Sequence, residues 1–266
     1  MKIQVKDING KELAFQEGDK EVELLYNGHY KEGDKLVFDF DNIKHVVVNI
    51  GEYIVESMIY APESKFEYSI PFGEKLTAYH SEAFQGNLHK LTARAANQKE
   101  ISEYRNMALN GLDKHQEINY YPHAYANVVT RNEPCFEPRN AIDGCKDNSS
   151  HGDYPYHSWG GGLRDDLEFT LYFGRELQVD KMVLYLRADY VNEHDTNWET
   201  GVFQFSDGSS MPISMIKTEK PQIYEFDTKT INWVKLTEIK RPVSSAYAAL
   251  TQIEVYGREM KKVIHS

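Results

Sequence analysis

The sequence has little of what defines several large classes of protein. It contains only two cysteines, Cys135 and Cys145, so a disulfide framework is excluded and we expect two free thiols, with a single bridge as the alternative. No apolar run approaches the roughly 20 residues that a transmembrane helix needs. The N-terminal stretch MKIQVKDINGKELAF lacks the apolar segment of a signal peptide. These absences predict a soluble, cytoplasmic protein.

Positive charge is also scarce. The chain carries 30 Lys and Arg against 41 Asp and Glu, for a formal net charge of −11. Proteins that bind nucleic acid or anionic membranes present basic patches, which this balance disfavours. We therefore expect neither of these partners.

What the chain does contain favours strands. Aromatic residues make up 12% of it, with 18 Tyr and 12 Phe, and alanine-rich helical runs are nearly absent. Residues 1–96 show closely spaced short runs of β-branched and aromatic residues, separated by turn signals such as Asn9-Gly10, Asn27-Gly28 and Gly33-Asp34. This spacing predicts an antiparallel β-sandwich or jelly roll.

One helix is predicted, over residues 99–110. Asn97 can cap it, and Glu100 stands at the capping-box position. Residues 97–120 then form the helix and linker, and residues 121–260 return to a strand pattern. The predicted fold class is all-β, with two tandem antiparallel sandwiches of jelly-roll type joined by a short helix.

The most unusual stretch is RNAIDGCKDNSSHGDYPYHSW, residues 139–159. So many polar groups could not be buried in a core strand without partners, because each unsatisfied group is costly. The segment is therefore predicted to be a structured loop, and loops of this composition often carry binding sites.

Six motifs occur in a defined order, and the first two lie within this stretch. They are NAIDG, a polar loop that ends in Ser-Trp, LEFTLYFGRELQVDKMVLYLR, FQFSDGS, WVKLTEI and LTQIEVYG. Over about residues 121–258 this order resembles the discoidin, or coagulation factor 5/8 type C, family. The resemblance implies a galactose-binding-like jelly roll that binds ligands, often carbohydrate, through loops at one end. Many bacterial members are carbohydrate-binding modules attached to glycosidases.

The resemblance also implies a structural calcium ion beneath the Asn-Ala-Ile-Asp-Gly loop. Its ligands would be the Asp143 carboxylate and the backbone carbonyls of Asn140 and Cys145, with Asn148 and Gln252 completing the set. Gln252 stands where the family usually has a glutamate, so one negative charge is missing. The alternative is that Asp143 only caps its Asp-Gly turn.

Aromatic rings beside polar side chains suit a sugar, because a pyranose offers an apolar C–H face and a rim of hydroxyls. The candidate ligand-binding residues from three loops are His151, Asp153, Tyr154, Tyr156, His157, Arg187, Asp189, His194, Asp195, Asn197, Trp198 and Tyr247. Trp198 is the favoured stacking platform, whereas Trp159 is expected to return to the core. Arg187 and Asp189 are equally consistent with an internal ion pair.

Non-catalytic binding of a saccharide or similar polyol is therefore the predicted function. Two alternatives stay open. The density of His and Asp would also suit a metal-dependent or carboxylate-based saccharide hydrolase, although no zinc or nucleophile motif appears. A cytoplasmic location would equally suit a protein–protein scaffold in which the first domain mediates self-association.

Overall fold

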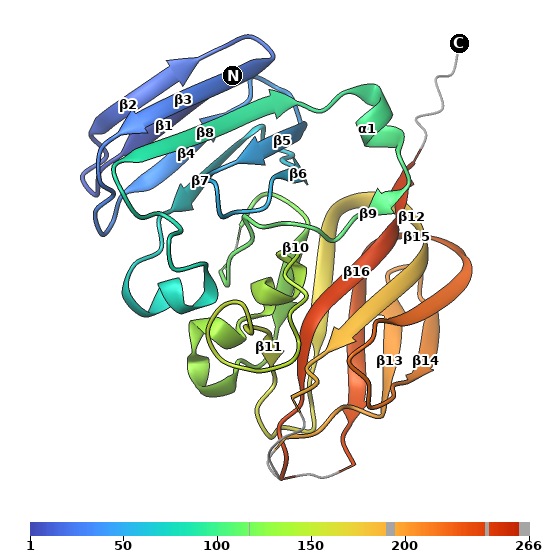
Figure 1. The fold of residues 1–266 in the computed structure, drawn as a ribbon. Helices are drawn as coiled ribbons and strands as arrows, with labels where there is room; N and C mark the ends of the chain where they lie inside the picture. The colour runs from blue at the N-terminus through green and yellow to red at the C-terminus, as the bar shows by residue number, and fades with distance from the viewer. Residues whose placement is uncertain (117, 190–194, 243–244, 261–266) are drawn as a thin grey trace, which may run out of the picture.

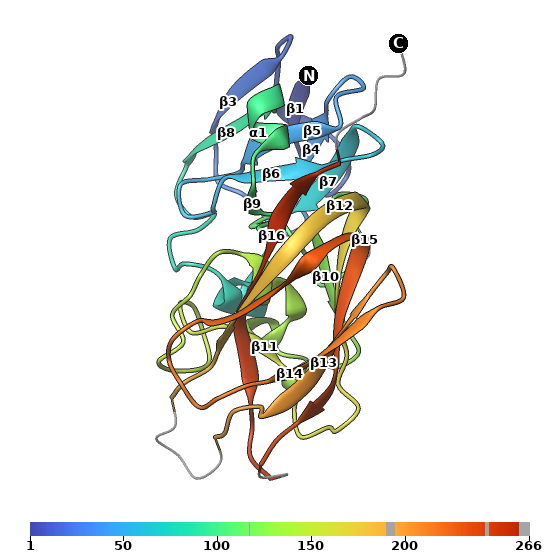
Figure 2. The same ribbon diagram turned by 90° about the vertical axis from the view of Figure 1, so that its right-hand side faces the viewer.

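The computed structural model describes residues 1–116, 118–189, 195–242 and 245–260. Two β-sandwich domains lie one above the other in both views (Figure 1 and Figure 2). The predicted all-β fold class with two sandwiches is confirmed. No helix in the described part of the chain is long and apolar enough to cross a membrane.

The N-terminal domain packs two four-stranded antiparallel sheets face to face. One sheet has the order β2 (Glu12–Glu17), β1 (Lys2–Lys6), β4 (Lys35–Asp39) and β7 (Lys65–Ser69). The other has the order β3 (Glu21–Asn27), β8 (Leu88–Ala95), β5 (His45–Asn49) and β6 (Ser57–Tyr60). Strict alternation of buried and exposed residues along β3 and β7 places one face of each strand in the core. The core is aromatic, and Phe38 stacks on Phe66 at 4.7 Å between ring centroids.

The C-terminal domain curls a single eight-stranded sheet around a second core. Its main order is β11 (Trp159–Gly160), β16 (Ala249–Glu259), β12 (Phe169–Leu186), β15 (Gln222–Lys240), β13 (Thr200–Phe205) and β14 (Ser210–Ser214). In addition, β10 (His123–Ala126) pairs with β12, and β9 (Arg105–Asn106) pairs with β16. Register shifts interrupt β12 between Tyr172 and Leu177 and again near Val179, which lets the long strand bend.

The predicted helix begins correctly but ends early. Helix α1 spans Gln98–Ser102, and both hydrogen bonds of the capping box between Asn97 and Glu100 are present. The chain then leaves the helix because Arg105–Asn106 pairs with β16, and the N–H of Met107 donates to the carbonyl of Val255 at 2.7 Å. Met107 and Ala108, which fall within the predicted helix, instead enter the C-terminal core, whereas Tyr104 is exposed.

The segment predicted as a linker serves both cores. Met107 and Ala108 are buried in the C-terminal core, whereas Leu112 and Tyr120 are buried in the N-terminal one. Residues Tyr60 and Tyr121 exchange backbone hydrogen bonds of 2.9 Å across the contact between the domains. The domain limits at residues 96 and 121 stay a prediction, since the segment between them packs on both sides.

Four short 3-10 turns complete the described elements. One, Gly73–Ala78, belongs to the N-terminal domain, and the others span Thr130–Asn132, Pro134–Phe136 and Pro138–Ile142. The last three precede β11. The described residues of the loops that follow β12 and β15 lie at the end of the C-terminal domain that points away from the N-terminal domain (Figure 1).

Candidate functional site

A cavity of about 280 Å³ opens among these loops. It is lined by Thr130, Arg131, Phe136, His151, Gly160, Arg187, Asp195, Tyr247, Ala248 and Ala249. The walls therefore come from four separate stretches of the chain, and every one of them is a loop or a strand end. Four of the predicted ligand-binding residues are among them.

Arg187 is the polar centre of the cavity. It directly follows β12, and its backbone N–H donates to the carbonyl of Ala249 on β16 at 3.0 Å, so the sheet fixes its position. Only 5% of its side chain is exposed. Its Nε lies 2.8 Å from Oδ1 of Asp189, and its Nη2 pairs with Asp195 and donates to the carbonyl of Tyr247 at 2.9 Å.

These ion pairs confirm the interpretation of Arg187 and Asp189 as an internal pair. A buried guanidinium needs such partners, because leaving it uncompensated would cost several kcal/mol. The pairing also holds the planar guanidinium in one orientation at the cavity wall. Asp189 does not line the cavity itself, and it contributes by pairing with the guanidinium of Arg187.

His151 and Tyr247 complete the site. The imidazole of His151 contacts the Asp189 carboxylate through Nδ1, while 40% of its side chain stays exposed. Tyr247 lies between the two loops because its backbone forms an isolated bridge with Asp195 and accepts the N–H of Thr196 at 2.8 Å. An exposed imidazole, a fixed guanidinium and a half-buried phenol ring thus share one small cavity.

The same cluster has the composition of a cation site. One ligand atom each from His151, Asp189 and Asp195 lie within 4.8 Å of one another. Arg187, however, is paired to both carboxylates and offsets half of their charge. A divalent cation here would have to compete with a buried guanidinium.

The four predicted ligand residues between positions 153 and 157 lie elsewhere. Tyr154 faces the N-terminal domain, where its N–H donates to the carbonyl of Thr77 at 2.8 Å and its ring packs against His80. His157 is buried, and its ring stacks on that of Tyr154 at 5.2 Å. Asp153 and Tyr156 form a turn, and neither lines the described cavity. The loop has its polar residues divided between the cavity and the contact between the domains.

The prediction that Trp198 is the stacking platform is wrong. Trp198 is fully buried, with its ring centroid 5.4 Å from that of Trp159, so it belongs to the core. Asn197 is also buried and donates from Nδ2 to the carbonyl of Trp198 at 2.8 Å. The polar neighbours of Trp198 suggested an exposed loop, yet the chain turns inward there. His194 falls outside the described residues.

Sequence reasoning missed Thr130, Arg131 and Phe136. Phe136 is buried at the cavity wall, and Arg131 lies over its ring at 5.3 Å while pairing with Glu133. The turn signal Asn132-Glu133-Pro134 marked this stretch as a loop, but nothing in it indicated that it returns to the same end as Arg187 and Asp195. Only the fold brings them together.

The residues around Asp143 do not fit a calcium ion. Calcium takes six to eight oxygen ligands, whereas Oδ2 of Asp143 lies 2.5 Å from Nε2 of the buried His157. Oδ1 accepts the N–H of Cys145 at 2.9 Å, which is the turn-capping role that was the alternative. Gln252 uses its carbonyl oxygen on the N–H of Gly144 at 3.2 Å.

The side-chain amides of Asn140 and Asn148 also hold the surrounding chain. Asn140 donates from Nδ2 to the carbonyls of Pro134 and Ser158, and Asn148 donates from Nδ2 to those of Leu186 and Glu219. The use of the backbone carbonyls of Asn140 and Cys145 as calcium ligands stays a prediction.

Neither cysteine provides a reactive thiolate. Both are free thiols, as expected. Burial raises the pKa of Cys135 and of Cys145 to about 11, so both stay protonated near neutral pH. Cys145 donates its S–H to the carbonyl of Pro155. A cysteine nucleophile near the Asp143–His157 pair is not supported.

No family model and no curated protein sequence matches the chain. Among solved structures, it is similar to chitosan-binding module 1 of a chitosanase/glucanase from Paenibacillus sp. IK-5, at 19% identity over 57% of this chain and 98% of that one, with a TM-score of 0.40. A fucose-binding module from Streptococcus pneumoniae matches at 15% identity over 58% and 98%, with a TM-score of 0.41. The family 32 carbohydrate-binding module of C. perfringens NanJ, solved with galactose, matches at 16% identity over 50% and 91%, with a TM-score of 0.37.

Proposed function

We propose that this protein binds a neutral saccharide, without catalysis, in the cavity formed by His151, Arg187, Asp195 and Tyr247. The observation that supports this is the convergence of an exposed imidazole, a fixed guanidinium and a phenol ring at the end of the jelly roll. Sugar hydroxyls need donors and acceptors held in place, and a sugar C–H face needs an aromatic surface.

The guanidiniums of the cavity are already paired, which favours a neutral ligand over an acidic one. Arg187 pairs with Asp189 and Asp195, and Arg131 pairs with Glu133. Hydroxyl groups can donate to the Asp195 carboxylate and accept from Arg187, whereas a uronic or sialic acid would have to compete with these carboxylates for the guanidiniums. The volume of about 280 Å³ suits the end of a glycan better than the middle of a long chain.

Titration calorimetry against a panel of neutral and acidic monosaccharides and short oligosaccharides tests this proposal. We expect Tyr247→Ala and His151→Ala each to weaken binding by about tenfold or more, which is the loss of one well-placed contact. Two exposed residues provide matched controls. Tyr125→Ala on β10 and His29→Ala in the N-terminal domain should leave the affinity unchanged. If no neutral saccharide binds, or if the cavity variants bind as well as their controls, the proposal fails.

The hydrolase alternative rests on one observation, the placement of His151, Asp189 and Asp195 within 4.8 Å. Elemental analysis of the purified protein distinguishes it, because a transition metal lost in His151→Ala would favour a metal-dependent reaction. The scaffold alternative, with self-association through the first domain, stays a prediction that light scattering can test.

A further inference from the structure

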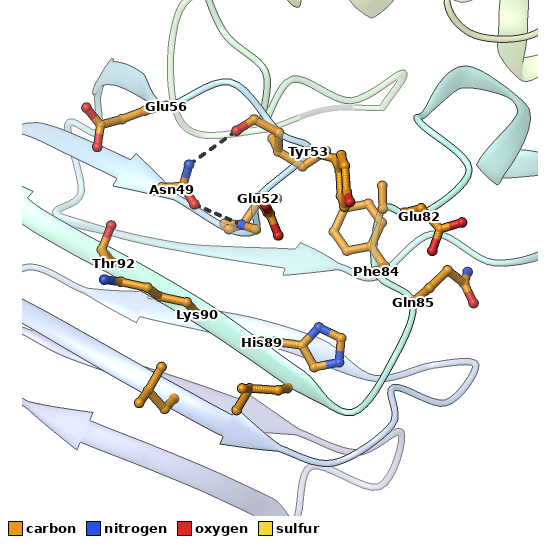
Figure 3. A pocket seen from close by; sticks show the side chains of 16 residues that line it. Asn49, Glu52, Tyr53, Glu56, Glu82, Phe84, Gln85, His89, Lys90 and Thr92 are labelled. Carbon is orange, nitrogen blue, oxygen red and sulfur yellow. Dashed lines mark hydrogen bonds between the residues drawn. The ribbon is translucent and has the colours of Figure 1, made fainter.

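The N-terminal domain carries a groove of about 660 Å³, larger than the cavity proposed for the saccharide. It lies over the β3–β8–β5–β6 sheet, on the face that carries Leu25, Lys90 and Thr92, whose neighbours along β3 and β8 point into the core. Residues 50–56 and 82–85 form its walls (Figure 3). All of its lining residues belong to the N-terminal domain.

The groove is strongly acidic. Glu52, Glu56 and Glu82 are exposed along it, and no ion pair is formed by any of them within the described residues. Its lysine, Lys90, is paired with Glu23 at 2.9 Å. The charge of Glu56 also contributes to raising the pKa of Arg94. Glu52 and Glu82, one from each wall, are therefore the carboxylates left to attract a cation from solvent.

The groove also offers apolar surface. Tyr53 is 43% exposed and stacks on His80 with ring centroids 4.2 Å apart and nearly parallel planes. This stacking holds the Tyr53 ring in one orientation at the groove wall. Leu25 and Leu88 are 58% and 66% exposed on the sheet side. Phe84 lines the groove with a backbone φ of +63°, a conformation that non-glycine residues adopt rarely.

His89 lies beneath the groove, on the face of β8 that points into the core. It is only 7% exposed, and its ring packs on those of Tyr26 and Tyr30 at 5.9 and 4.1 Å between centroids. Its imidazole therefore supports the core below the groove, and the side chains that can meet a ligand are the exposed Glu52, Glu82 and Tyr53.

The position of the groove disfavours an extended peptide. Peptides that join a sheet do so at an edge, where backbone groups are free. This groove lies across three neighbouring strands, and β8, at its centre, is paired with β3 on one side and β5 on the other. Recognition here must come from side chains, which suits a compact molecule with polar groups on an apolar frame.

We propose that this groove is a second binding site, for a small ligand that carries ammonium groups, held by Glu52 and Glu82 with its apolar face on Tyr53. Two sources share this chemistry, an oligomer of amino sugars and a linear polyamine. The site is separate from the saccharide cavity of the C-terminal domain and does not depend on the function proposed for it.

Calorimetry on the full chain at low ionic strength, with three probes, tests the proposal. The probes are a glucosamine trimer, its N-acetylated counterpart, which has the same rings without the charge, and spermidine. We expect the charged trimer or spermidine to bind, the N-acetylated trimer to bind at least about tenfold more weakly, and added salt to weaken binding. The stronger of the two charged probes identifies the source.

Variants then locate the site. The double variant Glu52→Gln, Glu82→Gln should weaken binding of the charged probe by about tenfold or more, and Tyr53→Ala should weaken it as well. Because the chain is acidic overall, the control removes two other exposed carboxylates of the same domain, in Glu12→Gln, Glu67→Gln, and should leave the affinity nearly unchanged. Equal losses in both double variants, equal binding of the N-acetylated trimer, or no binding of either charged probe would overturn the proposal. Tyr247→Ala should not alter this binding, which separates its outcome from that of the saccharide proposal.

Discussion

At the scale of single residues, burial decides which aromatic side chains can meet a ligand. The polar residues around Trp198 made it look exposed in sequence, as the tyrosines of the same loops did. The structure places Trp159 and Trp198 in one core and leaves Tyr247 half-buried at the cavity and Tyr53 exposed at the groove. The residues with aromatic surface available to a ligand are therefore tyrosines.

Trp198→Ala should destabilise the C-terminal domain. The indole is fully buried against Trp159, so its removal leaves a large cavity, and we expect a loss of about 3–5 kcal/mol in the free energy of unfolding. Trp198→Phe should cost less, because it keeps a ring and removes an indole N–H that has no partner among the described residues. Urea unfolding followed by circular dichroism measures both. Equal stability of wild type and Trp198→Ala would contradict the burial of this side chain in the core.

At the scale of elements, the bend in β12 positions Arg187. The strand runs from Phe169 to Leu186 and changes register between Tyr172 and Leu177, so its second half pairs with β16 and ends at the cavity. Gly174 lies in this interruption with φ of +67°. A Cβ atom there would lie 2.2 Å from the ring of Tyr121.

Gly174→Ala should therefore be more damaging than an ordinary glycine substitution. The positive φ alone costs a side chain about 1–2 kcal/mol, and displacement of the Tyr121 ring adds to it. Gly208→Ala is the matched control, because Gly208 has φ of +85° but no atom within 4 Å of its Cβ position. Thermal unfolding of the two variants compares them. If Gly174→Ala unfolds at the same temperature as Gly208→Ala, the contact with Tyr121 contributes nothing.

At the scale of the whole molecule, a largely buried carboxylate joins the two domains. Glu259, near the end of β16, pairs with Arg175 on β12 and lies 3.2 Å from Nε2 of His45 on β5. Arg175 also lies over the ring of Tyr60 at 4.8 Å. The end of the C-terminal sheet is thus tied to the N-terminal domain by charge as well as by the Tyr60–Tyr121 backbone pair.

The contribution of Glu259 should depend on pH. Burial would raise its pKa, but hydrogen bonds from His45 and Arg175 outweigh this and lower the pKa to about 2. A depressed pKa means that the stabilisation is fully present above the unfolded value of about 4.3 and is lost as the pH falls from there through about 2. At pH 7, Glu259→Gln should cost about 2 kcal/mol.

The measurement is urea unfolding of wild type and Glu259→Gln between pH 7 and pH 2, where we expect the difference between them to shrink with acidification. Glu67→Gln, which breaks an exposed pair with Lys35, should cost less than about 1 kcal/mol throughout. A difference for Glu259→Gln that stays constant across this range would rule out the carboxylate as the cause.

The sequence by itself determined the class of fold, because alternation of apolar residues and turn chemistry are local properties. Neighbouring residues alone predicted the strands of both domains and the Asn97–Glu100 capping box. They also predicted the burial of Trp159 and the Asp143 turn. Neighbouring residues did not predict where the helix ends. It ends early because Arg105 and Asn106 pair with β16, about 150 positions further along the chain. The same holds for the sites. Of the residues that the sequence predicted to bind ligand, His151, Arg187, Asp195 and Tyr247 line one cavity. His157 and Trp198 are buried elsewhere, because a polar stretch does not reveal which of its residues face inward. Burial and convergence depend on contacts between distant segments, and only the tertiary structure decided which residues share the cavity and which support the core.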